Sequence, residues 1–100
     1  MPNSHDQTDS AYAYLLALLS QTDNQAQLAE IFAMLMTQKE QTELANRLTI
    51  FALLQQGMTQ REISAQLGVG IATVSRGAKV FGQHNIDELL PNLGEALKRK

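Results

Sequence analysis

The chain has 100 residues, a formal net charge of −2 and no cysteine, so it has the size of one small domain. The lack of cysteine excludes disulfides and Cys-ligated zinc. The two histidines, His5 and His84, stand far apart with no clustered ligand set, so we expect no metal site. The slight excess of acidic residues argues against non-specific coating of nucleic acid, although a local basic patch is compatible with specific binding.

Residues 1–9 are polar and show no periodicity, so we expect a flexible N-terminal arm. Asp9 or Ser10 can cap a helix that runs to about Ser20 and is apolar on nearly every face. Such a helix must be buried, and so short a chain cannot easily surround it, so we infer that a second subunit covers it. The apolar run, residues 11–19, is far shorter than the roughly 20 residues that span a bilayer. A signal peptide has a cationic segment before its apolar run, and none precedes this one, so we expect no signal peptide. We therefore expect a cytoplasmic protein with no membrane partner.

A second helix starts at Asn24, whose side chain can cap the first turn near Gln27. Its apolar stripe has the i, i+3, i+4, i+7 spacing typical of one helix face and consists of Leu28, Ile31, Phe32 and Leu35. Met34 and Met36 close this helix. Methionine adapts to irregular spaces, so either residue can line a ligand pocket, but filling the core is its more frequent role.

Thr37 and Glu40 repeat the capping-box pattern and open a third helix, which runs to about Gln56. Its predicted inner stripe is Leu44, Leu48, Phe51 and Leu54. Arg47 lies one turn after Glu43, and an i,i+4 ion pair between them would contribute only about 0.2–0.5 kcal/mol. We interpret residues 10–57 as a helical dimerisation core.

Residues 58–82 have the pattern of a helix-turn-helix. Thr59 and Glu62 can form a capping box, Gly68 stops the first helix, and the second begins near Ile71. The predicted inward set is Ile63, Leu67, Val69 and Val74, with the small Ser64 where the helices approach. The outward set is Thr73, Ser75, Arg76 and Lys79. Helix pairs with a glycine turn also occur in bundles that never touch DNA, so it is the outward basic and hydroxyl residues that favour DNA reading.

Residues 83–100 are predicted to form a C-terminal helical segment. Asn85 can cap it, and Pro91 requires either a break or a new helix start. The predicted fold class is all-α, with about six short helices. No nucleophile–base set, paired carboxylates or phosphate loop is visible, so we do not expect an enzyme.

The string from Gly68 to Gly77, Gly-Val-Gly-Ile-Ala-Thr-Val-Ser-Arg-Gly, closely resembles the turn and recognition helix of the bacterial tryptophan repressor family. The resemblance extends back through Met58 to Glu62 and, more loosely, to Met34–Thr37 and Arg47. It covers roughly residues 25–82. It implies an intertwined all-helical homodimer that binds L-tryptophan as corepressor, then binds double-stranded operator DNA and represses tryptophan synthesis genes.

The resemblance also implies a ligand-binding set: Met34, Met36, Thr37, Arg47, Arg76, Gly77 and Val80. Arg76 would bind the ligand carboxylate and Arg47 would stack on the indole, as a planar, always charged guanidinium can. Thr37, with the backbone near the two methionines, would help to hold the polar ends of the ligand. Gly77 would let the indole approach the backbone, and Val80 stands where family members often carry a serine that contacts the ligand amino group. Thr37 as a helix cap and Arg76 as a phosphate anchor are the competing interpretations.

The implied DNA-binding set is Gln60, Arg61, Gly70, Ile71, Ala72, Thr73, Ser75 and Lys79. Arg61 would read a guanine edge, a bidentate contact that provides about 1–3 kcal/mol of base discrimination. Gln60 and Ser75 would lie near phosphates. Residues 71–73 would meet base edges partly through water, a mode for which this family's operator complex is itself the standard example.

Two other functions stay open at this point. One is a helix-turn-helix regulator gated by a different small ligand, or by none, because Val80 alters the pocket. The other is a dimeric protein-interaction module with no DNA role. Arg61→Ala separates them, since only a DNA-binding protein would lose operator affinity.

Overall fold

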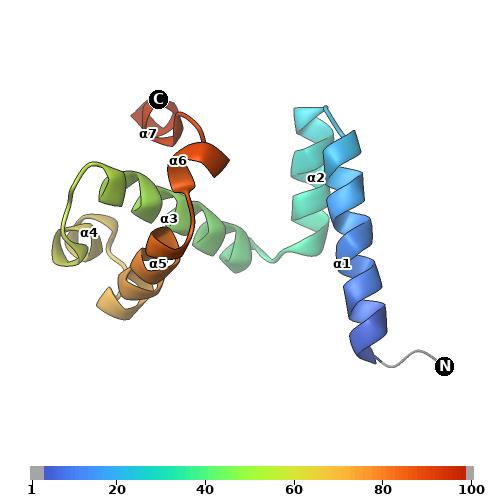
Figure 1. Cartoon of the computed structure of the whole chain (residues 1–100), viewed down its shortest axis with the longest axis horizontal. Helices are drawn as coiled ribbons and strands as arrows, with labels where there is room; N and C mark the ends of the chain where they lie inside the picture. The colour runs from blue at the N-terminus through green and yellow to red at the C-terminus, as the bar shows by residue number, and fades with distance from the viewer. Residues whose placement is uncertain (1–3, 99–100) are drawn as a thin grey trace. The chain divides into compact units, whose positions relative to one another are not determined.

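The computed structural model describes residues 4–98, and helix is the only regular secondary structure among them. The helices are α1 (Ser4–Gln21), α2 (Gln25–Leu35), α3 (Gln38–Gln55), α4 (Gln60–Leu67), α5 (Ile71–Gln83), α6 (Ile86–Leu89) and α7 (Leu93–Lys98) (Figure 1). The predicted all-α class is confirmed, with seven helices in the described residues where about six were expected. The chain divides into two compact units, residues 1–38 and 39–100.

The first unit is a helical hairpin in which α1 and α2 run antiparallel (Figure 1). Asn24 is the N-cap of α2, as predicted, and its side-chain oxygen accepts the N–H of Gln27 at 2.9 Å. The predicted start of α1 at residues 9–10 is wrong, because the helix already begins at Ser4. Once the apolar turns have nucleated a helix, each added polar residue costs little, and Asp6 in the first turn complements the helix dipole. Residues 1–3 of the predicted arm lie outside the described residues.

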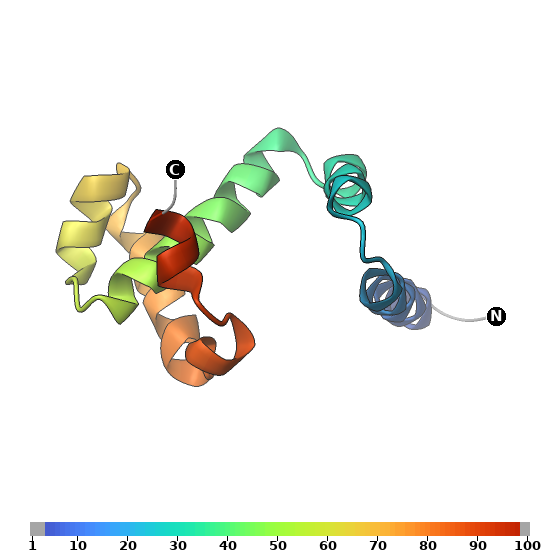
Figure 2. The ribbon, with the colours of Figure 1, turned by 90° about the horizontal axis from the view of Figure 1, so that it is seen from above.

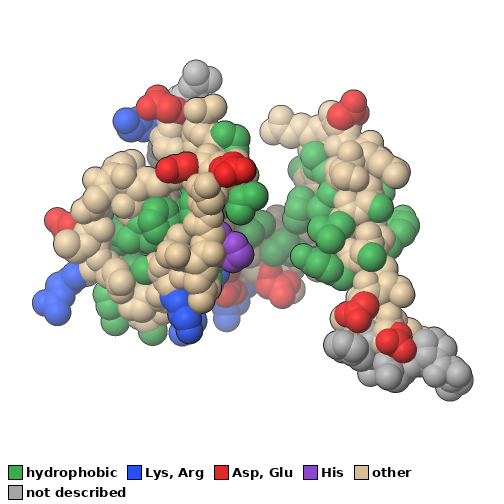
Figure 3. Space-filling view, in the orientation of Figure 1, with side chains coloured by type: hydrophobic (Ala, Val, Ile, Leu, Met, Phe, Trp, Pro, Cys, Tyr) green, Lys and Arg blue, Asp and Glu red, His purple; other side chains and the backbone are tan. Residues whose placement is uncertain are grey.

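The surface of this hairpin is unusually apolar for a single chain. Tyr12, Tyr14 and Leu16 of α1 are 63%, 68% and 51% exposed, and green hydrophobic side chains appear on the hairpin in Figure 3. An apolar groove of about 580 Å³ runs along the hairpin, lined by residues of both helices. The chain by itself therefore does not bury α1, and the second subunit that would cover it stays a prediction.

Two expectations for α2 are wrong within this chain. Leu35, predicted for the inner stripe, is 55% exposed, and Met34, for which core filling was the more frequent role, is 75% exposed. Ile31 is the buried member of the stripe. Two helices alone can bury only a narrow strip of each other, so the rest of each apolar face stays in contact with solvent.

The second unit is organised around the C-terminal half of α3, against which α4 and α5 pack (Figures 1 and 2). Its core contains Ile50, Leu53, Ile63 and Val74, with the half-buried Leu54, Met58, Leu67 and Val69 around it. The predicted inward set of the helix-turn-helix is thus confirmed. Because α3 supplies half of this core, the compact units divide after residue 38, whereas the sequence alone suggests a boundary after residue 57.

The predicted inner stripe of α3 is only partly right. Phe51 is buried, but Leu44 is 45% exposed, and Ile50 and Leu53, which the prediction omitted, are buried instead. Helix α3 has apolar residues on two adjacent faces, and the face that contacts α4 and α5 is the one that is buried. Periodicity alone does not select between two such faces.

The C-terminal segment packs on α3 and α5. The rings of Phe51 and Phe81 lie 6.1 Å apart between centroids, and Ile86 of α6 is buried. Gln55 of α3 donates a side-chain hydrogen bond to Asp87 of α6. Asn85 caps α6, as predicted, and the chain breaks around Pro91 before α7 begins.

Candidate functional site

Helix α4 begins with the predicted capping box. The hydroxyl of Thr59 accepts the N–H of Glu62 at 3.1 Å, and the carboxylate of Glu62 accepts the N–H of Thr59 at 2.9 Å. The backbone N–H of Thr59 and, as the second cause, its side chain hydrogen-bond the Glu62 carboxylate and hold its pKa below its ordinary value. The first turn of α4 is therefore fixed by a carboxylate that must stay ionised.

The turn between α4 and α5 is held by backbone conformation and by a serine. Gly68 adopts the left-handed conformation (φ 69°, ψ 29°), and its N–H donates to the carbonyl of Ser64 at 2.9 Å. The hydroxyl of Ser64 donates to the carbonyl of Val69 at 2.6 Å. The sequence indicated that Ser64 should be small, but not that its hydroxyl would tie α4 to the turn.

A second polar link joins the two helices at the protein surface. The hydroxyl of Ser75 on α5 donates to the side-chain carbonyl oxygen of Gln60, the first residue of α4, at 2.7 Å. On the opposite side of the pair, Ile63 and Val74 are completely buried. The two helices are thus held in one relative orientation by apolar contacts within and by a hydrogen bond outside.

Seven of the eight residues predicted to bind DNA are exposed: Gln60, Arg61, Gly70, Ile71, Ala72, Ser75 and Lys79. Ile71 is a large apolar residue and is nevertheless 51% exposed at the first position of α5. Figure 3 shows blue Lys and Arg side chains at the ends of the α4–α5 region. The exposed set combines two positive charges with small and apolar side chains, a composition suited to phosphates and to base edges.

A cavity of about 110 Å³ lies between α3 and α5 and is lined by Glu43, Asn46, Arg47, Ile50, Thr73 and Arg76. It brings together Arg47 and Arg76, the two predicted ligand-binding arginines. Arg76 also donates a long hydrogen bond of 3.4 Å to the hydroxyl of Thr73, one turn earlier on α5. Thr73, predicted to bind DNA, is half-buried and lines this cavity.

The sequence prediction omitted three of the lining residues, Glu43, Asn46 and Ile50. With Arg47 they follow the i, i+3, i+4, i+7 spacing of a single helix face, and this spacing was the signal that could have found them. The i,i+4 ion pair that Glu43 and Arg47 could form is not present among the described residues. Both side chains line the cavity instead.

Gly77 has a structural role that the resemblance did not imply. It is buried, and a Cβ atom there would lie 3.1 Å from Cγ2 of Ile50. The missing side chain thus allows α5 to approach α3 closely beside the cavity. Val80, one turn further, is half-buried and is not among the residues that line the cavity. Met34, Met36 and Thr37 belong to the other unit, and their ligand role stays a prediction.

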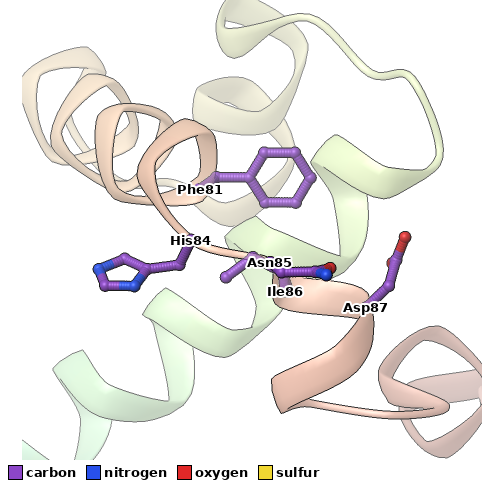
Figure 4. A pocket seen from close by; sticks show the side chains of 5 residues that line it. All are labelled: Phe81, His84, Asn85, Ile86 and Asp87. Carbon is purple, nitrogen blue, oxygen red and sulfur yellow. The ribbon is translucent and has the colours of Figure 1, made fainter.

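A shallower cavity of about 180 Å³ lies where α5 leads into α6, lined by Phe81, His84, Asn85, Ile86 and Asp87. Figure 4 shows the His84 ring and the Asp87 carboxylate pointing in opposite directions. They therefore form no acid–base pair, and His84 is exposed. The side chain of His5 lies outside the described part of the chain.

Neither a metal site nor a membrane span is found in residues 6–98, the part of the chain whose side chains the structure describes. No group of three or more His, Cys, Asp or Glu there could hold a metal ion. None of the helices in the same residues combines the length and the apolar character needed to cross a bilayer.

The capped α4, the left-handed glycine turn and the exposed face of α5 define a helix-turn-helix protein with a small polar cavity behind its second helix. The chain belongs to the Trp repressor family: the family model described as Trp repressor protein matches residues 10–97. Family members are regulators rather than enzymes, so this chain is a regulator of the Trp operon repressor type.

Curated relatives support the same family. A Trp operon repressor homolog of Aliivibrio salmonicida is 38% identical over 80 residues, which cover 79% of this chain and 74% of the relative. One from Vibrio cholerae is 40% identical over 80 residues, covering 79% and 78%. One from Xylella fastidiosa is 31% identical over 83 residues, covering 82% and 90%. No solved structure gives a significant match.

Proposed function

We propose that this chain is a dimeric, cytoplasmic, sequence-specific DNA-binding repressor that requires L-tryptophan to bind operators of tryptophan synthesis genes. The single observation that carries the proposal is that one helix, α5, lines the cavity with some of its residues and exposes others. Thr73 and Arg76 line the cavity toward α3, while Ile71, Ala72 and Ser75 are exposed on the same helix. A ligand in the cavity therefore contacts the helix that would enter the major groove.

On the ligand side, Arg76 binds the carboxylate and Arg47 stacks on the aromatic ring at the edge of the cavity. The volume of about 110 Å³ is below the roughly 150 Å³ of a dry cavity that holds benzene. The cavity therefore takes the charged end of the ligand, and the ring lies beyond it. Met34, Met36 and Thr37 remain predicted ligand-binding residues. Such a ligand acts only through its preference for the DNA-competent arrangement, with couplings typically about 1–3 kcal/mol.

On the DNA side, a surface hydrogen bond between two of the predicted DNA-binding residues supports the proposal. The Gln60–Ser75 hydrogen bond links the N-terminus of α4 to α5, and it leaves the side-chain NH2 group of Gln60 to donate to a phosphate. Arg61 is exposed on the first turn of α4. From there its guanidinium group would donate to a guanine edge. Lys79 lies two turns along α5 from Ala72 and adds charge for the DNA backbone.

The dimer is needed because one small reading helix contacts only a half-site. Two copies must present their α5 helices about 34–36 Å apart to enter successive major grooves. The exposed apolar residues of α1 and α2, with the groove of about 580 Å³, are the surface that a second copy covers. Without a second copy, these apolar side chains would stay in contact with water, and an exposed apolar patch typically marks an interaction surface.

A gel-shift titration of palindromic operator DNA, with and without L-tryptophan, tests the proposal. We expect tryptophan to raise the affinity at least about fivefold. Identical binding curves with and without tryptophan would refute the claim that tryptophan controls DNA binding. The Val80 side chain can neither accept nor donate a hydrogen bond, so it cannot bind the ligand ammonium as a serine there would, and this favours a second candidate, the same regulator gated by another amino acid or indole. A calorimetric series of these ligands would reveal it as a tighter binder than tryptophan.

A further inference from the structure

We infer that Ser75 acts on DNA binding through Gln60. Its hydroxyl holds the carbonyl oxygen of the Gln60 side chain, so the NH2 group of the same amide is the donor that is presented to a DNA phosphate. The inference rests on the proposed function, because it concerns the DNA-binding surface of the same protein. It makes Ser75 a positioning residue, whereas the resemblance implied only that Gln60 and Ser75 would each lie near a phosphate.

The hydroxyl of Ser75 does not bond within its own helix. A serine or threonine side chain in a helix commonly donates to a backbone carbonyl of the preceding turn. Thr49 on α3 does so, with a bond of 3.0 Å to the carbonyl of Ala45. Ser75 instead donates across to α4, to Oε1 of Gln60 at 2.7 Å. Such a bond orients a side chain of the partner helix, which a bond within α5 could not do.

The backbone is held in place at both ends of this hydrogen bond. Gln60 is the first residue of α4 and directly follows Thr59, whose capping box with Glu62 fixes the first turn. Ser75 directly follows Val74, which is completely buried in the core between α3, α4 and α5. The Gln60 side chain between these points is long and rich in rotamers. The bond to Ser75 restricts it to the rotamers that bring its carbonyl oxygen to α5.

The direction of the hydrogen bond determines what each side chain can offer to DNA. A serine hydroxyl has one proton, and Ser75 uses it on Gln60. The phosphates of DNA offer only acceptor oxygens, so the Ser75 hydroxyl has no proton for a phosphate while this bond is intact. The Gln60 amide keeps both of its N–H donors. The linked pair therefore binds a phosphate through the NH2 group of Gln60, next in the chain to the exposed Arg61.

Loss of the Ser75 hydroxyl should be felt only through Gln60. Without the hydrogen bond, the Gln60 side chain samples its other rotamers, including those that turn the carbonyl oxygen toward the phosphate and repel it. Ordering one rotamer-rich side chain on binding lowers the affinity about twofold to tenfold. If Gln60 is absent, the hydroxyl has no amide to orient, and its removal should have no further effect.

The test is a double-mutant cycle of Ser75→Ala and Gln60→Ala, which measures whether the two residues act on DNA together. Ser75→Thr is the conservative variant, because it keeps the hydroxyl. Gln66→Ala is the matched control, since Gln66 is an exposed glutamine near the other end of α4. The probe is a palindromic duplex that wild-type protein selects from random-sequence double-stranded DNA in the presence of L-tryptophan. Fluorescence anisotropy measures the affinity of each variant for it.

We expect Ser75→Ala to weaken binding about twofold to tenfold per half-site. The double variant should bind as weakly as Gln60→Ala alone. Ser75→Thr and Gln66→Ala should bind as wild type does. In the free protein, NMR relaxation should show a more mobile Gln60 side-chain NH2 group in Ser75→Ala than in wild type.

The outcomes separate this inference from the proposed function. If wild-type protein selects no duplex, the proposed function fails. If it selects one and the losses of the two alanine variants multiply in the double variant, Ser75 has a DNA contact of its own and the positioning role is overturned. An unchanged affinity of Ser75→Ala, or an equal loss in Ser75→Thr, would overturn it as well. Equal mobility of the Gln60 NH2 group in wild type and Ser75→Ala would overturn it independently of any DNA.

Discussion

Gly77→Ala tests whether the close approach of α5 to α3 depends on a residue without a side chain. The new Cβ would lie 3.1 Å from Cγ2, 3.7 Å from Cδ1 and 3.8 Å from Cβ of Ile50. Ile50 is completely buried, and its β-branched side chain has few alternative rotamers in a helix. The 3.1 Å contact is shorter than the roughly 3.5–4.0 Å optimum for two carbon atoms, so one of the helices must shift by a few tenths of an ångström.

Two opposing effects decide the size of the change. Replacing glycine by alanine inside a helix gains about 0.8–1.0 kcal/mol of helix propensity, whereas overpacking a filled core costs about 1–3 kcal/mol. The expected net result is destabilisation by about 1 kcal/mol, and a melting temperature lowered by about 4–8 °C. Thermal unfolding followed by circular dichroism measures it.

Gly82→Ala is the matched control, because Gly82 lies in the same helix and nothing is within 4 Å of the position that a Cβ atom would take there. In this variant only the higher helix propensity of alanine applies, so its free energy of unfolding should exceed that of wild type by up to about 1 kcal/mol. If Gly77→Ala were stabilised to the same extent as Gly82→Ala, the close contact with Ile50 would have no energetic consequence, and the argument for Gly77 would be refuted.

The capping box, the serine in the turn and the exposed arginine of α4 can each be tested separately. Glu62→Gln should destabilise the protein at neutral pH. The lowered pKa of Glu62 means that the folded state favours the carboxylate. Its contribution to the free energy of unfolding is complete above the ordinary pKa of about 4.5 and is lost as the pH falls through the folded-state pKa. Urea unfolding of both proteins across pH 3–7 measures this, and the same dependence of stability on pH in both would contradict it. Ser64→Ala should cost about 0.5–1.5 kcal/mol, since it deletes the hydrogen bond to the Val69 carbonyl; unchanged stability would mean that water replaces the hydroxyl. Arg61→Ala should weaken operator binding while tryptophan binding stays as in wild type, because Arg61 is exposed and lies outside the cavity. Filter binding measures the affinity for operator DNA and calorimetry the affinity for tryptophan, and an equal loss of both would indicate damage to the fold.

The sequence predicted the helix-turn-helix well because its signals are local. A capping box needs only Thr59 and Glu62, and a left-handed turn needs only Gly68, so neighbouring residues determine both features. The buried positions Ile63 and Val74 follow from the same short segment.

The buried face of α3 could not be predicted in the same way. Leu44 and Ile50 are both apolar, and the choice between their faces depends on where α4 and α5 pack. The cavity was missed for a related reason. From the sequence, Glu43 could be considered only with Arg47 on its own helix. In the structure both residues line a cavity whose other wall comes from α5. The two walls come from segments far apart in the chain, so no local pattern contains the cavity.

The central claim is that the ligand cavity and the DNA-reading face are coupled through α5. The most direct measurement is a calorimetric titration of L-tryptophan into the free protein and into the protein saturated with operator DNA. Because coupling between two binding sites is reciprocal, tryptophan should bind the DNA complex about 5- to 150-fold more tightly. Equal affinities in the two titrations would contradict the claim.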